Sequence, residues 1–534
     1  MSRFRSRLPD SPPRAETISL VLGDQLTPPD GDGPGARWLA EVDRACDAVV
    51  MIEATGESTY VPSHRQRIAL FLAAMRHHAL DLAGRGIPVD YTALDDPDSV
   101  VDADFGSTLL ATIRRLGATR VRVRRPGEWR MLRLVERACR DAGVELVVDE
   151  DPAFLTTPAD FARFREGRKS IVMDHFYRQE RKRLGVLLED DGSPIGGAWS
   201  HDHANRQSFK HAPTTPPPWF PEPDDVTLEV IRLVAERFPD APGRLERFVW
   251  ATTPADARRM LDDFIDKRLP DFGRYQDAMW TNEPFLNHSL LSPAINLQLL
   301  DPRDCIAAAV AAFERGDAPI ESVEGFVRQI MGWREFIRGV YWTEGEDYAD
   351  RNGLDEHGSL PAWYWTGETD LACLRDAIGQ VVEFGYGHHI QRLMITGNFA
   401  LIAGIEPRQV SDWYLAMFVD AVDCVTLPNA LGMVMHADGG VVGTKPYAAS
   451  ANYVGRMSNH CKSCRWNRKA RSGDDACPFN VFYWDFLIRH RERLRGNRRM
   501  AIPLKNVDRL DPTERDEITA TAAKHRVRLG IGQG

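Results

Sequence analysis

Three of the eight cysteines in this 534-residue chain lie in one short stretch, residues 459–480. Cys461 and Cys464 are separated by two residues, and Cys477 follows after twelve more and directly precedes a proline. Thiols at this spacing are typical of ligands to zinc or to an iron–sulfur cluster. The sequence therefore predicts a metal centre, and the Cys-Pro pair with the apolar residues after it favours a cluster.

The fourth ligand of this centre has to come from outside the triplet. Five cysteines and one histidine are available: Cys46, Cys139, Cys305, Cys373, Cys424 and His460. We favour Cys373, which lies in a predicted helical stretch after the aromatic run 361–367. His460 stays open as a ligand, although its position directly before Cys461 makes ligation by both residues awkward.

Two adjacent histidines, His388 and His389, form a second group that could do chemistry. Histidine exchanges protons near neutral pH, so the two could act as a proton-transfer pair beside a substrate. The alternative is a single histidine packed against a polar partner, because neighbouring helical positions face different directions. Trp365, Trp413 and Tyr414 are expected in the core, but such rings can also relay single electrons when a redox cofactor is near.

The stretch 287–295 places Ser289 and Ser292 three residues apart beside a predicted helix start. Hydroxyls and free backbone amides at such a position suit a phosphate group, and an ordinary helix cap is the alternative. The formal charge of −10 is unevenly distributed, since the chain from Lys445 onward holds 19 Lys and Arg against 9 Asp and Glu. This basic part includes the run 489–500 and indicates either a solvated helix face or contact with a phosphate backbone.

The elements that would position these groups differ between the two halves of the chain. Five short apolar runs predict β-strands, at residues 17–23, 48–53, 89–94, 119–124 and 144–149. A long helix pattern lies between the second and third runs, and such alternation predicts a doubly wound parallel sheet. The pattern G-x-G-x-x-G does not follow the first strand, which disfavours an ordinary dinucleotide site.

Polar side chains follow three of these strands. They are Asp24 and Gln25, Glu53 and Glu57, and the stretch 125–130. Ligands bind at the carboxyl ends of the strands in sheets of this type. The polar residues therefore either are solvated loop residues or surround a small polar-edged ring compound.

Strand patterns almost vanish after a proline-rich stretch at 195–228, and helical stripes follow at 321–342, 388–405 and 410–425. We therefore expect four parts, namely a flexible tail (1–15), an α/β domain (16–150), an interdomain linker region (151–230) and a large all-α domain (231–534). No signal peptide and no apolar run of membrane-spanning length is found in the sequence. We expect a cytoplasmic protein whose cysteines act as thiols and metal ligands.

Six longer motifs give the sequence a family resemblance. They are "GWREFIRGVYW", "HHIQRLMITGNFAL", "DWYLAMFVDA", "LPNALGM", "GTKPYAASANY" and the cysteine pattern. Together they resemble the cryptochrome/photolyase superfamily over nearly the whole chain. More narrowly, the chain is similar to the bacterial and archaeal branch with an iron–sulfur cluster, which includes (6-4) photolyases and photoreceptor-like cryptochromes.

The resemblance implies three cofactors. FAD would lie in the helical domain, at positions that match Ser289, Leu291, Ser292, Arg392, Asn398, Asp420 and Asn429. A light-harvesting antenna, 6,7-dimethyl-8-ribityllumazine, would lie in the α/β domain near Asp24, Glu53 and Glu57. Cys373, Cys461, Cys464 and Cys477 match the ligands of a [4Fe-4S] cluster, which resolves the choice of fourth ligand by resemblance.

The resemblance also implies an activity, which is light-driven electron transfer from reduced FAD to a (6-4) photoproduct in UV-damaged DNA. His388 or His389 would supply the proton, Tyr447 would contact the flipped lesion, and Trp365, Trp413 and Tyr414 would conduct electrons to the flavin. We expect a monomer. The alternative is a blue-light photoreceptor of the cryptochrome type, and a weaker one is a DNA-binding module whose cluster senses oxidants.

Overall fold

The computed structural model describes residues 4–29, 33–96 and 104–532 of the chain. Its first part is built on one five-stranded parallel sheet with the strand order β3-β2-β1-β4-β5. The strands are β1 (Thr17–Leu20), β2 (Asp47–Ile52), β3 (Val89–Thr92), β4 (Arg120–Arg124) and β5 (Glu145–Asp149). The predicted doubly wound sheet is confirmed, and the strand order reverses between β1 and β4.

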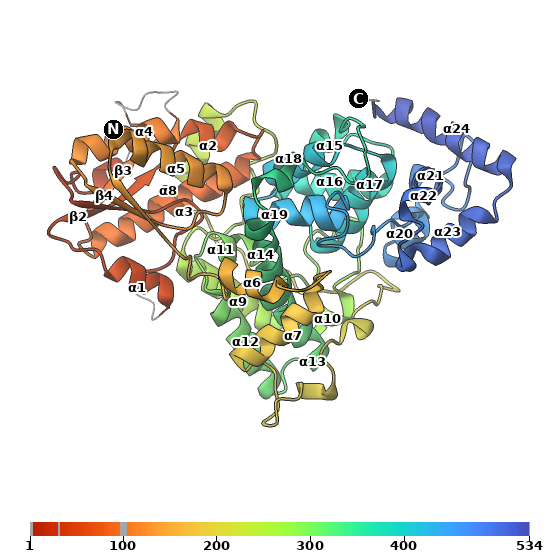
Figure 1. The fold of residues 1–534 in the computed structure, drawn as a ribbon, viewed down its shortest axis with the longest axis horizontal. Helices are drawn as coiled ribbons and strands as arrows, with labels where there is room; N and C mark the ends of the chain where they lie inside the picture. Colours follow the sequence, from red (N-terminus) through yellow and green to blue (C-terminus); the bar gives the residue numbers. More distant parts are fainter. Residues whose placement is uncertain (1–3, 30–32, 97–103, 533–534) are drawn as a thin grey trace.

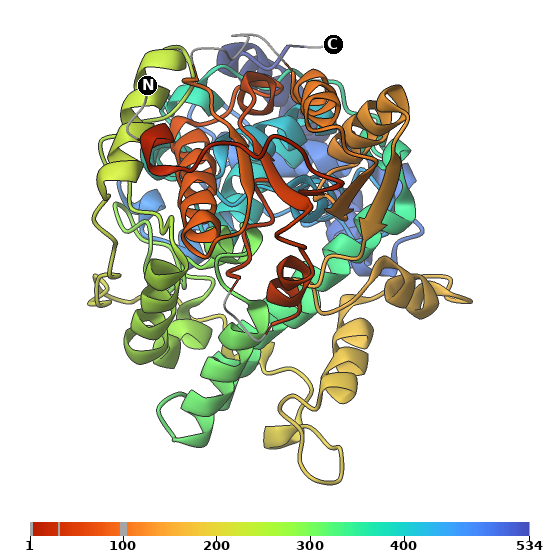
Figure 2. The same cartoon turned by 90° about the vertical axis from the view of Figure 1, so that its left-hand side faces the viewer.

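Helices cover both faces of this sheet (Figures 1 and 2). They are α1 (Pro34–Ala40), α2 (Thr55–Thr59), α3 (Arg65–Gly84), α4 (Phe105–Leu116) and α5 (Trp129–Ala142). Alternate residues of one strand face opposite layers: Val49 and Met51 pack with α3, whereas Ala48 and Val50 pack with α4 and α5. The period of two explains why both faces of these strands are apolar.

The rest of the chain is helical, as the sequence predicts. Its helices are α6 (Pro158–Arg165), α7 (Met173–Leu184), α8 (Asp225–Arg237), α9 (Pro254–Lys267), α10 (Leu269–Tyr275), α11 (Ser292–Asn296), α12 (Pro302–Glu314), α13 (Ile320–Val327), α14 (Glu335–Glu344), α15 (Trp363–Thr366), α16 (Ala372–Phe384), α17 (Asn398–Ala403), α18 (Pro407–Met417), α19 (Asp423–Pro428), α20 (Ala451–Met457), α21 (Pro478–Arg489), α22 (Arg491–Leu494), α23 (Ala501–Asp508) and α24 (Pro512–Leu529). Within the described ranges, no helix combines the length and the apolar character that crossing a membrane requires.

Short π- and 3₁₀-helical segments interrupt or extend these helices. The π-helical segments are η4 (Arg328–Arg334), η6 (Gln391–Gly397) and η7 (Asn429–Val434). The 3₁₀ segments are η1 (Arg5–Arg7), η2 (Ile195–Gly197), η3 (Asp202–Ala204), η5 (Glu346–Asp350), η8 (His460–Lys462) and η9 (Arg498–Met500). π-Helical turns are rare overall, but they occur often at functional sites. η6 and η7 lie in two of the motifs that carry the family resemblance.

One continuous core joins the α/β part to the helical part, and α3 packs against α8. Residues 205–224 form neither helix nor strand, in agreement with the proline-rich connection predicted there. In Figure 1 the helices α20 to α24 form the end of the molecule opposite the sheet. The cysteine-rich segment and the sheet are therefore at opposite ends of the fold.

The N-terminal segment, which the sequence predicts to be a flexible tail, has one residue anchored in the core. Phe4 is fully buried, and its ring lies 5.0 Å from that of Tyr91 in an edge-on contact. The Arg76 guanidinium lies over the Phe4 ring at 4.9 Å. This anchor holds Phe4 against α3 and β3, whereas the side chains of residues 5–14 are exposed or half-buried, and residues 1–3 lie outside the described part.

Candidate active site and cofactor pockets

An ion pair between Arg392 of η6 and Asp420, just before α19, organises the centre of the helical part. The two guanidinium Nη atoms donate to the two carboxylate oxygens, each at 2.9 Å. Ser292 Oγ at the start of α11 donates to Asp420 Oδ2 (2.6 Å), and Asn296 Nδ2 donates to the Asp420 carbonyl (2.8 Å). Three segments far apart in sequence therefore meet here, and three of the predicted FAD positions lie in one network.

The other four predicted FAD positions lie around this network in different ways. Ser289 Oγ accepts a weak hydrogen bond from the Leu291 N–H (3.4 Å), and Leu291 is fully buried. Asn398 accepts from the Ala449 N–H (3.0 Å) and donates to the Ala449 carbonyl (2.9 Å), which holds the Tyr447 segment against α17. Asn429 Nδ2 donates to the carbonyl of the residue four positions earlier in α19 (2.7 Å).

The histidine pair has unequal surroundings. His388 is buried and its ring stacks on that of His288, with centroids 4.3 Å apart and planes 11° apart. Within the described residues, three ring nitrogens have no hydrogen-bond partner, namely Nδ1 and Nε2 of His388 and Nε2 of His288. His389 is exposed to solvent. Unsatisfied buried polar atoms are rare in proteins, so these nitrogens indicate a polar ligand in contact with the pair.

The protein lowers the pKa values of three imidazoles, so that they are neutral near pH 7. Burial lowers the pKa of His288 to about 3 and lowers the pKa of His388 well below its ordinary value. The protein around His389, together with the Arg392 guanidinium, also lowers the pKa of His389. His288 is a residue that sequence reasoning missed, although it lies inside the predicted phosphate-binding stretch.

Aromatic side chains form a chain of ring contacts that starts beside Arg392. Tyr414 donates to the Arg392 carbonyl (2.6 Å), and its ring lies 5.2 Å from that of the fully buried Trp413. Trp413 lies 5.1 Å from Tyr364, which lies 4.7 Å from Trp363. Two of the three predicted electron-transfer residues are therefore in contact, and Tyr364 and Trp363 extend the chain.

Trp365, the third predicted electron-transfer residue, is half-buried against the core and makes no aromatic ring contact with any other described residue. The sequence could not distinguish it from Trp363, because both lie in α15 on either side of Tyr364. Only the direction of each side chain decides which ring continues the chain.

Tyr447 is half-buried near the basic C-terminal part. Burial raises the pKa of its hydroxyl, and the nearby Arg499 guanidinium opposes this shift. The run 489–500 is less basic in the fold than in the sequence, because four of its six arginines pair with carboxylates. Within the described chain, Arg498 and Arg499 have no acidic partner.

Further basic side chains on this part of the chain have no ion-pair partner among the described residues either. They are Lys445, Arg456, Lys462, Arg468, Lys505 and Lys524. Lys445 lies 6.0 Å from the Tyr447 ring centroid, and Lys462 lies 5.9 Å from the Trp280 ring centroid. Unpaired cations interleaved with aromatic rings suit a nucleic-acid backbone better than an internal ion-pair network would.

The four cysteines predicted as metal ligands line one small cavity together. Cys373 comes from α16, Cys461 and Cys464 from the segment after α20, and Cys477 from the residue before α21. Most of the other lining side chains are apolar, and Arg468 and His460 are the polar ones. Burial raises the pKa of Cys373, and the neighbouring thiols add to this shift. The remaining cysteines lie elsewhere, and all eight are free thiols.

This donor set is one that a metal centre built on thiolates would use. Four thiols without a carboxylate suit either zinc or a four-iron cluster. Within the described residues, no group of three or more His, Cys, Asp or Glu is placed to hold a metal ion. His460 also borders the cavity, but its Nε2 hydrogen-bonds to Asp376 Oδ2 (2.9 Å).

A second cavity of about 110 Å³ lies at the carboxyl ends of β1 and β2. Asp24, Glu53 and Glu57 all line it, together with Gly127 after β4 and Val422 from the helical part. The Gly127 N–H donates to Asp24 Oδ2 (3.1 Å), and a side chain at Gly127 would overlap both Asp24 and Val422. The three predicted antenna residues therefore share one pocket at the boundary of the two parts.

The carboxylates of this pocket differ in their electrostatics. Burial, with Asp151 and Glu128 nearby, raises the pKa of Asp24 to about 7. The Glu53 carboxylate is occupied by Arg76 (2.7 Å) and by the Tyr91 hydroxyl (2.6 Å). Asp24 is therefore a carboxyl group of this pocket whose pKa lies near neutral pH.

The chain is related to known proteins over almost its whole length. It is 45% identical over 506 residues to a curated (6-4) photolyase of Agrobacterium fabrum, an alignment that covers 95% of this chain and 98% of that protein. The chain belongs to the cryptochrome/photolyase superfamily. Residues 19–250 also match the family described as deoxyribodipyrimidine photo-lyase-related protein.

Two solved structures share the photolyase fold. The crystal structure of a class III photolyase of Agrobacterium tumefaciens superposes with a TM-score of 0.54 at 15% identity, covering 97% of this chain and 99% of that one. A cryptochrome of Synechocystis sp. superposes with a TM-score of 0.52 at 14% identity, covering 98% and 100%. These two likenesses concern the fold, and they confirm the α/β plus all-α architecture.

Proposed function

We propose that this member of the photolyase superfamily repairs (6-4) photoproducts in DNA by light-driven electron transfer from reduced FAD. The observation that carries the proposal is the stacked pair of His288 and His388, three of whose buried ring nitrogens lack hydrogen-bond partners among the described residues and whose pKa values are lowered in part by the Arg392 guanidinium. The identity to a (6-4) photolyase over 95% of the chain supports the same reaction.

FAD would be held by the segments that meet at Asp420. Ser289, Leu291 and Ser292 would bind its phosphates at the start of α11, and Arg392, Asn398, Asp420 and Asn429 would line the rest of the cofactor. When bound and reduced, FAD supplies the light-excited electron that the lesion accepts. The fit rests on the buried imidazole nitrogens without partners and on the fixed orientation of Arg392.

The protein's own contribution to the chemistry is a placed proton. Repair of a (6-4) product needs a proton together with the electron, because a hydroxyl group has to return to its original base. His389 is exposed and can reach a ligand from solvent, whereas His388 is buried and stacks on His288. We therefore assign proton donation to His389 and a supporting role to His388.

DNA would lie across the basic C-terminal part, with the lesion flipped out of the duplex toward the histidines. Lys445, Arg498 and Arg499 would contact phosphates, and Tyr447 would contact the flipped bases. A damaged pair stacks poorly, which lowers the cost of extrusion and contributes to selectivity.

The finer assignments are part of the same proposal. Cys373, Cys461, Cys464 and Cys477 would bind a [4Fe-4S] cluster, and the pocket at Asp24 would hold 6,7-dimethyl-8-ribityllumazine. Trp413, Tyr414 and Trp365 would conduct electrons to FAD. The division at residues 150 and 230, a monomeric state and a cytoplasmic location remain predictions.

The test is a repair assay on an oligonucleotide that contains one (6-4) thymine pair. Reduced protein is illuminated with blue light, and the products are separated by chromatography. We expect intact thymines in the light only, and their loss in His389→Ala. No recovery from protein that carries reduced flavin and a cluster would favour the photoreceptor instead.

A further inference from the structure

A chain of buried hydrogen bonds connects the histidine pair to α16. The backbone N–H of His388 donates to Gln391 Oε1 (3.1 Å), and Gln391 Nε2 donates to Gln380 Oε1 (2.5 Å). Gln380 Nε2 then donates to Asp376 Oδ2 (3.1 Å). Both glutamines are almost fully buried, with exposures of 3% for Gln391 and 6% for Gln380.

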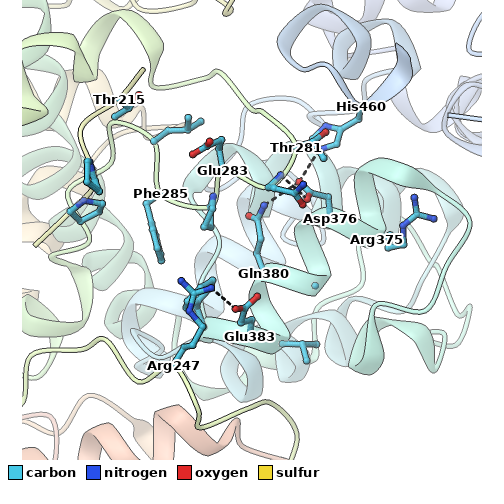
Figure 3. Close-up of a pocket in the computed structure, with 18 of the residues that line it drawn as sticks. Thr215, Arg247, Thr281, Glu283, Phe285, Arg375, Asp376, Gln380, Glu383 and His460 are labelled. Carbon is cyan, nitrogen blue, oxygen red and sulfur yellow. Dashed lines mark hydrogen bonds and ion pairs between the residues drawn. The ribbon is translucent and has the colours of Figure 1, made fainter. Parts of the chain in front are cut away.

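The chain ends at the cysteine-rich segment. Asp376 Oδ2 also bonds to His460 Nε2 (2.9 Å), the residue directly before Cys461, and Asp376 Oδ1 accepts from the Asn282 N–H (3.1 Å). Figure 3 shows Asp376 between Gln380 and His460, on the wall of a surface groove of about 760 Å³. The buried chain therefore spans the helix that carries Cys373.

The direction of every bond in this chain is fixed. A backbone N–H at one end can only donate, and a carboxylate at the other end can only accept. Neither glutamine amide can therefore turn over without losing a partner at both of its ends. Burying two flexible glutamines costs side-chain entropy and desolvation, and an apolar side chain would fill the same space without those costs.

The first link has a local structural role as well. His388 directly precedes the helical segment that starts at His389, so its N–H lacks an intrahelical acceptor, and Gln391 supplies one as half of a capping box. Such a cap does not need Gln380 and Asp376 behind it. The extension of the chain fixes the position of the cap itself and so the orientation of the peptide that carries both imidazoles.

We propose that Gln391 is a positioning residue for the histidine pair, held by Gln380 and Asp376, and that this chain ties the pair to the cysteine-rich segment. The inference rests on the proposed repair function, because that function is what gives the position of the two imidazoles a purpose. The side-chain hydrogen bonds of Gln391 go to His388 and Gln380, and not to Arg392 or Asp420 of the proposed flavin site. The effect of Gln391 on repair would therefore be indirect.

The test compares three variants in the light-driven repair assay. Gln391→Met removes both hydrogen bonds at similar volume, and we expect the repair yield to fall by about tenfold, since small misplacements of reacting groups are costly. Gln391→Glu keeps an acceptor for the His388 N–H, but it loses the donor to Gln380 and buries a carboxylate against Gln380 Oε1, so it should lower repair at least as much as Gln391→Met. Gln409→Met is the matched control. Gln409 also accepts a hydrogen bond from a backbone N–H (2.8 Å) and donates one to a carboxylate (2.7 Å), but it is not part of the hydrogen-bond chain that reaches His388.

A double variant tests whether the glutamines act as one chain. Gln380→Met should lower repair about as much as Gln391→Met, and combining the two should add little, because residues in one network are not additive. Flavin content, iron content and affinity for damaged DNA should stay at wild-type values. Full additivity, or a yield for Gln391→Met within about twofold of wild type, would overturn the inference.

Hydrogen exchange at the His388 amide provides a readout that does not depend on repair. Both Gln391→Met and Gln380→Met should speed exchange at this amide. If the wild-type protein shows no repair, the proposed function is contradicted. If exchange at the His388 amide is unchanged in the Met variants, the inference is contradicted, whether or not the wild-type protein repairs DNA. If Gln391→Met does not fold, Gln380→Met carries both measurements.

Discussion

At the scale of single residues, the site is governed by charges and imidazoles placed where water is scarce. The Arg392–Asp420 pair is bidentate and mostly buried, and Ser292 and Asn296 satisfy further acceptors on Asp420. A buried charge is tolerated when it is paired and hydrogen-bonded, but removing one partner leaves the other uncompensated. Asp420 is therefore both a structural anchor and part of the proposed flavin site.

Asp420→Asn should show how much of this arrangement depends on charge. The amide has the shape of the carboxylate, but it leaves the Arg392 guanidinium unpaired, so we expect the free energy of unfolding to fall by about 3 kcal/mol. FAD content after purification should fall as well. Asp412→Asn, which breaks the exposed pair with Arg408, is the control and should change stability by less than about 1 kcal/mol. Equal stability of the two variants in denaturant titrations would contradict this prediction.

The lowered histidine pKa values give repair a pH dependence of defined sign. His388 and His389 are neutral at pH 7 because the protein lowers their pKa values, and a neutral imidazole is too weak an acid to give its N–H proton to the lesion base. The protonated fraction rises as the pH falls, so the repair yield should rise by up to about tenfold per pH unit above the pKa. Yields measured between about pH 9 and pH 7 test this, with His389→Gln as the variant in which the dependence should disappear.

The same shifts limit the useful range of that experiment. A histidine whose pKa is lowered in the fold contributes stability above its ordinary pKa of 6.5, and this stability is lost as the pH falls. Protonation of the stacked His288 and His388 should therefore reduce the free energy of unfolding as the pH falls below 6.5. A repair yield that rises with pH would contradict the assignment of proton donation to a histidine.

At the scale of elements, the sequence predicts the type of each element better than the contacts between elements. The sheet and the helical half follow from periodicity, because an apolar period of two or of 3.6 has to face a core. The connection is predicted by its proline-rich, polar composition. The contact between His288 and His388 does not follow, since it joins residues a hundred positions apart through tertiary packing. The choice between Trp363 and Trp365 also needs side-chain directions, which no pattern in α15 contains.

The anchored N-terminus illustrates the same limit. A basic, proline-rich stretch is typical of a tail, yet one aromatic residue, Phe4, finds a buried site between Arg76 and Tyr91. The basic run 489–500 is the reverse case, since its charge is evident in the sequence but most of it is neutralised by Glu356, Asp355, Glu492 and Asp508. Composition predicts charge, and only the fold decides how much of it remains available.

Cys373→Ser should separate the contribution of α16 from that of the cysteine-rich segment. Cys373 comes from a helix remote in sequence from the other three thiols, so its loss should remove iron and the visible absorption of a cluster and loosen the contact between α16 and η8. Cys305→Ser, a buried cysteine of α12 outside the cavity, is the control and should keep its iron. Iron analysis and absorption spectra measure both, and full iron content in Cys373→Ser would exclude this residue as a ligand.

At the scale of the whole molecule, the fold places its two pockets and its basic surface so that each can act on a common centre. The Asp24 pocket borders Val422, two residues from Asp420, and α16 connects the cysteine cavity to the histidine pair. The chain as a whole is acidic, with a formal charge of −10, so any attraction for DNA has to be local. Lys445 and Arg499, which have no ion-pair partner among the described residues, would supply it near Tyr447.

Salt dependence of DNA binding tests this local attraction. Each phosphate contact that is lost should reduce the slope of log affinity against log salt by about 1. Arg498→Gln combined with Arg499→Gln should therefore reduce the slope by about 2, for damaged and undamaged duplexes alike, because phosphate contacts carry no sequence or lesion information. Arg491→Gln is the matched control in the same run, since Arg491 is already paired with Asp508 and Glu492, and it should leave the slope nearly unchanged. A larger effect of Arg491→Gln than of the double variant would mean that DNA displaces the internal ion pairs and lies across α22 and α23 instead of over Tyr447.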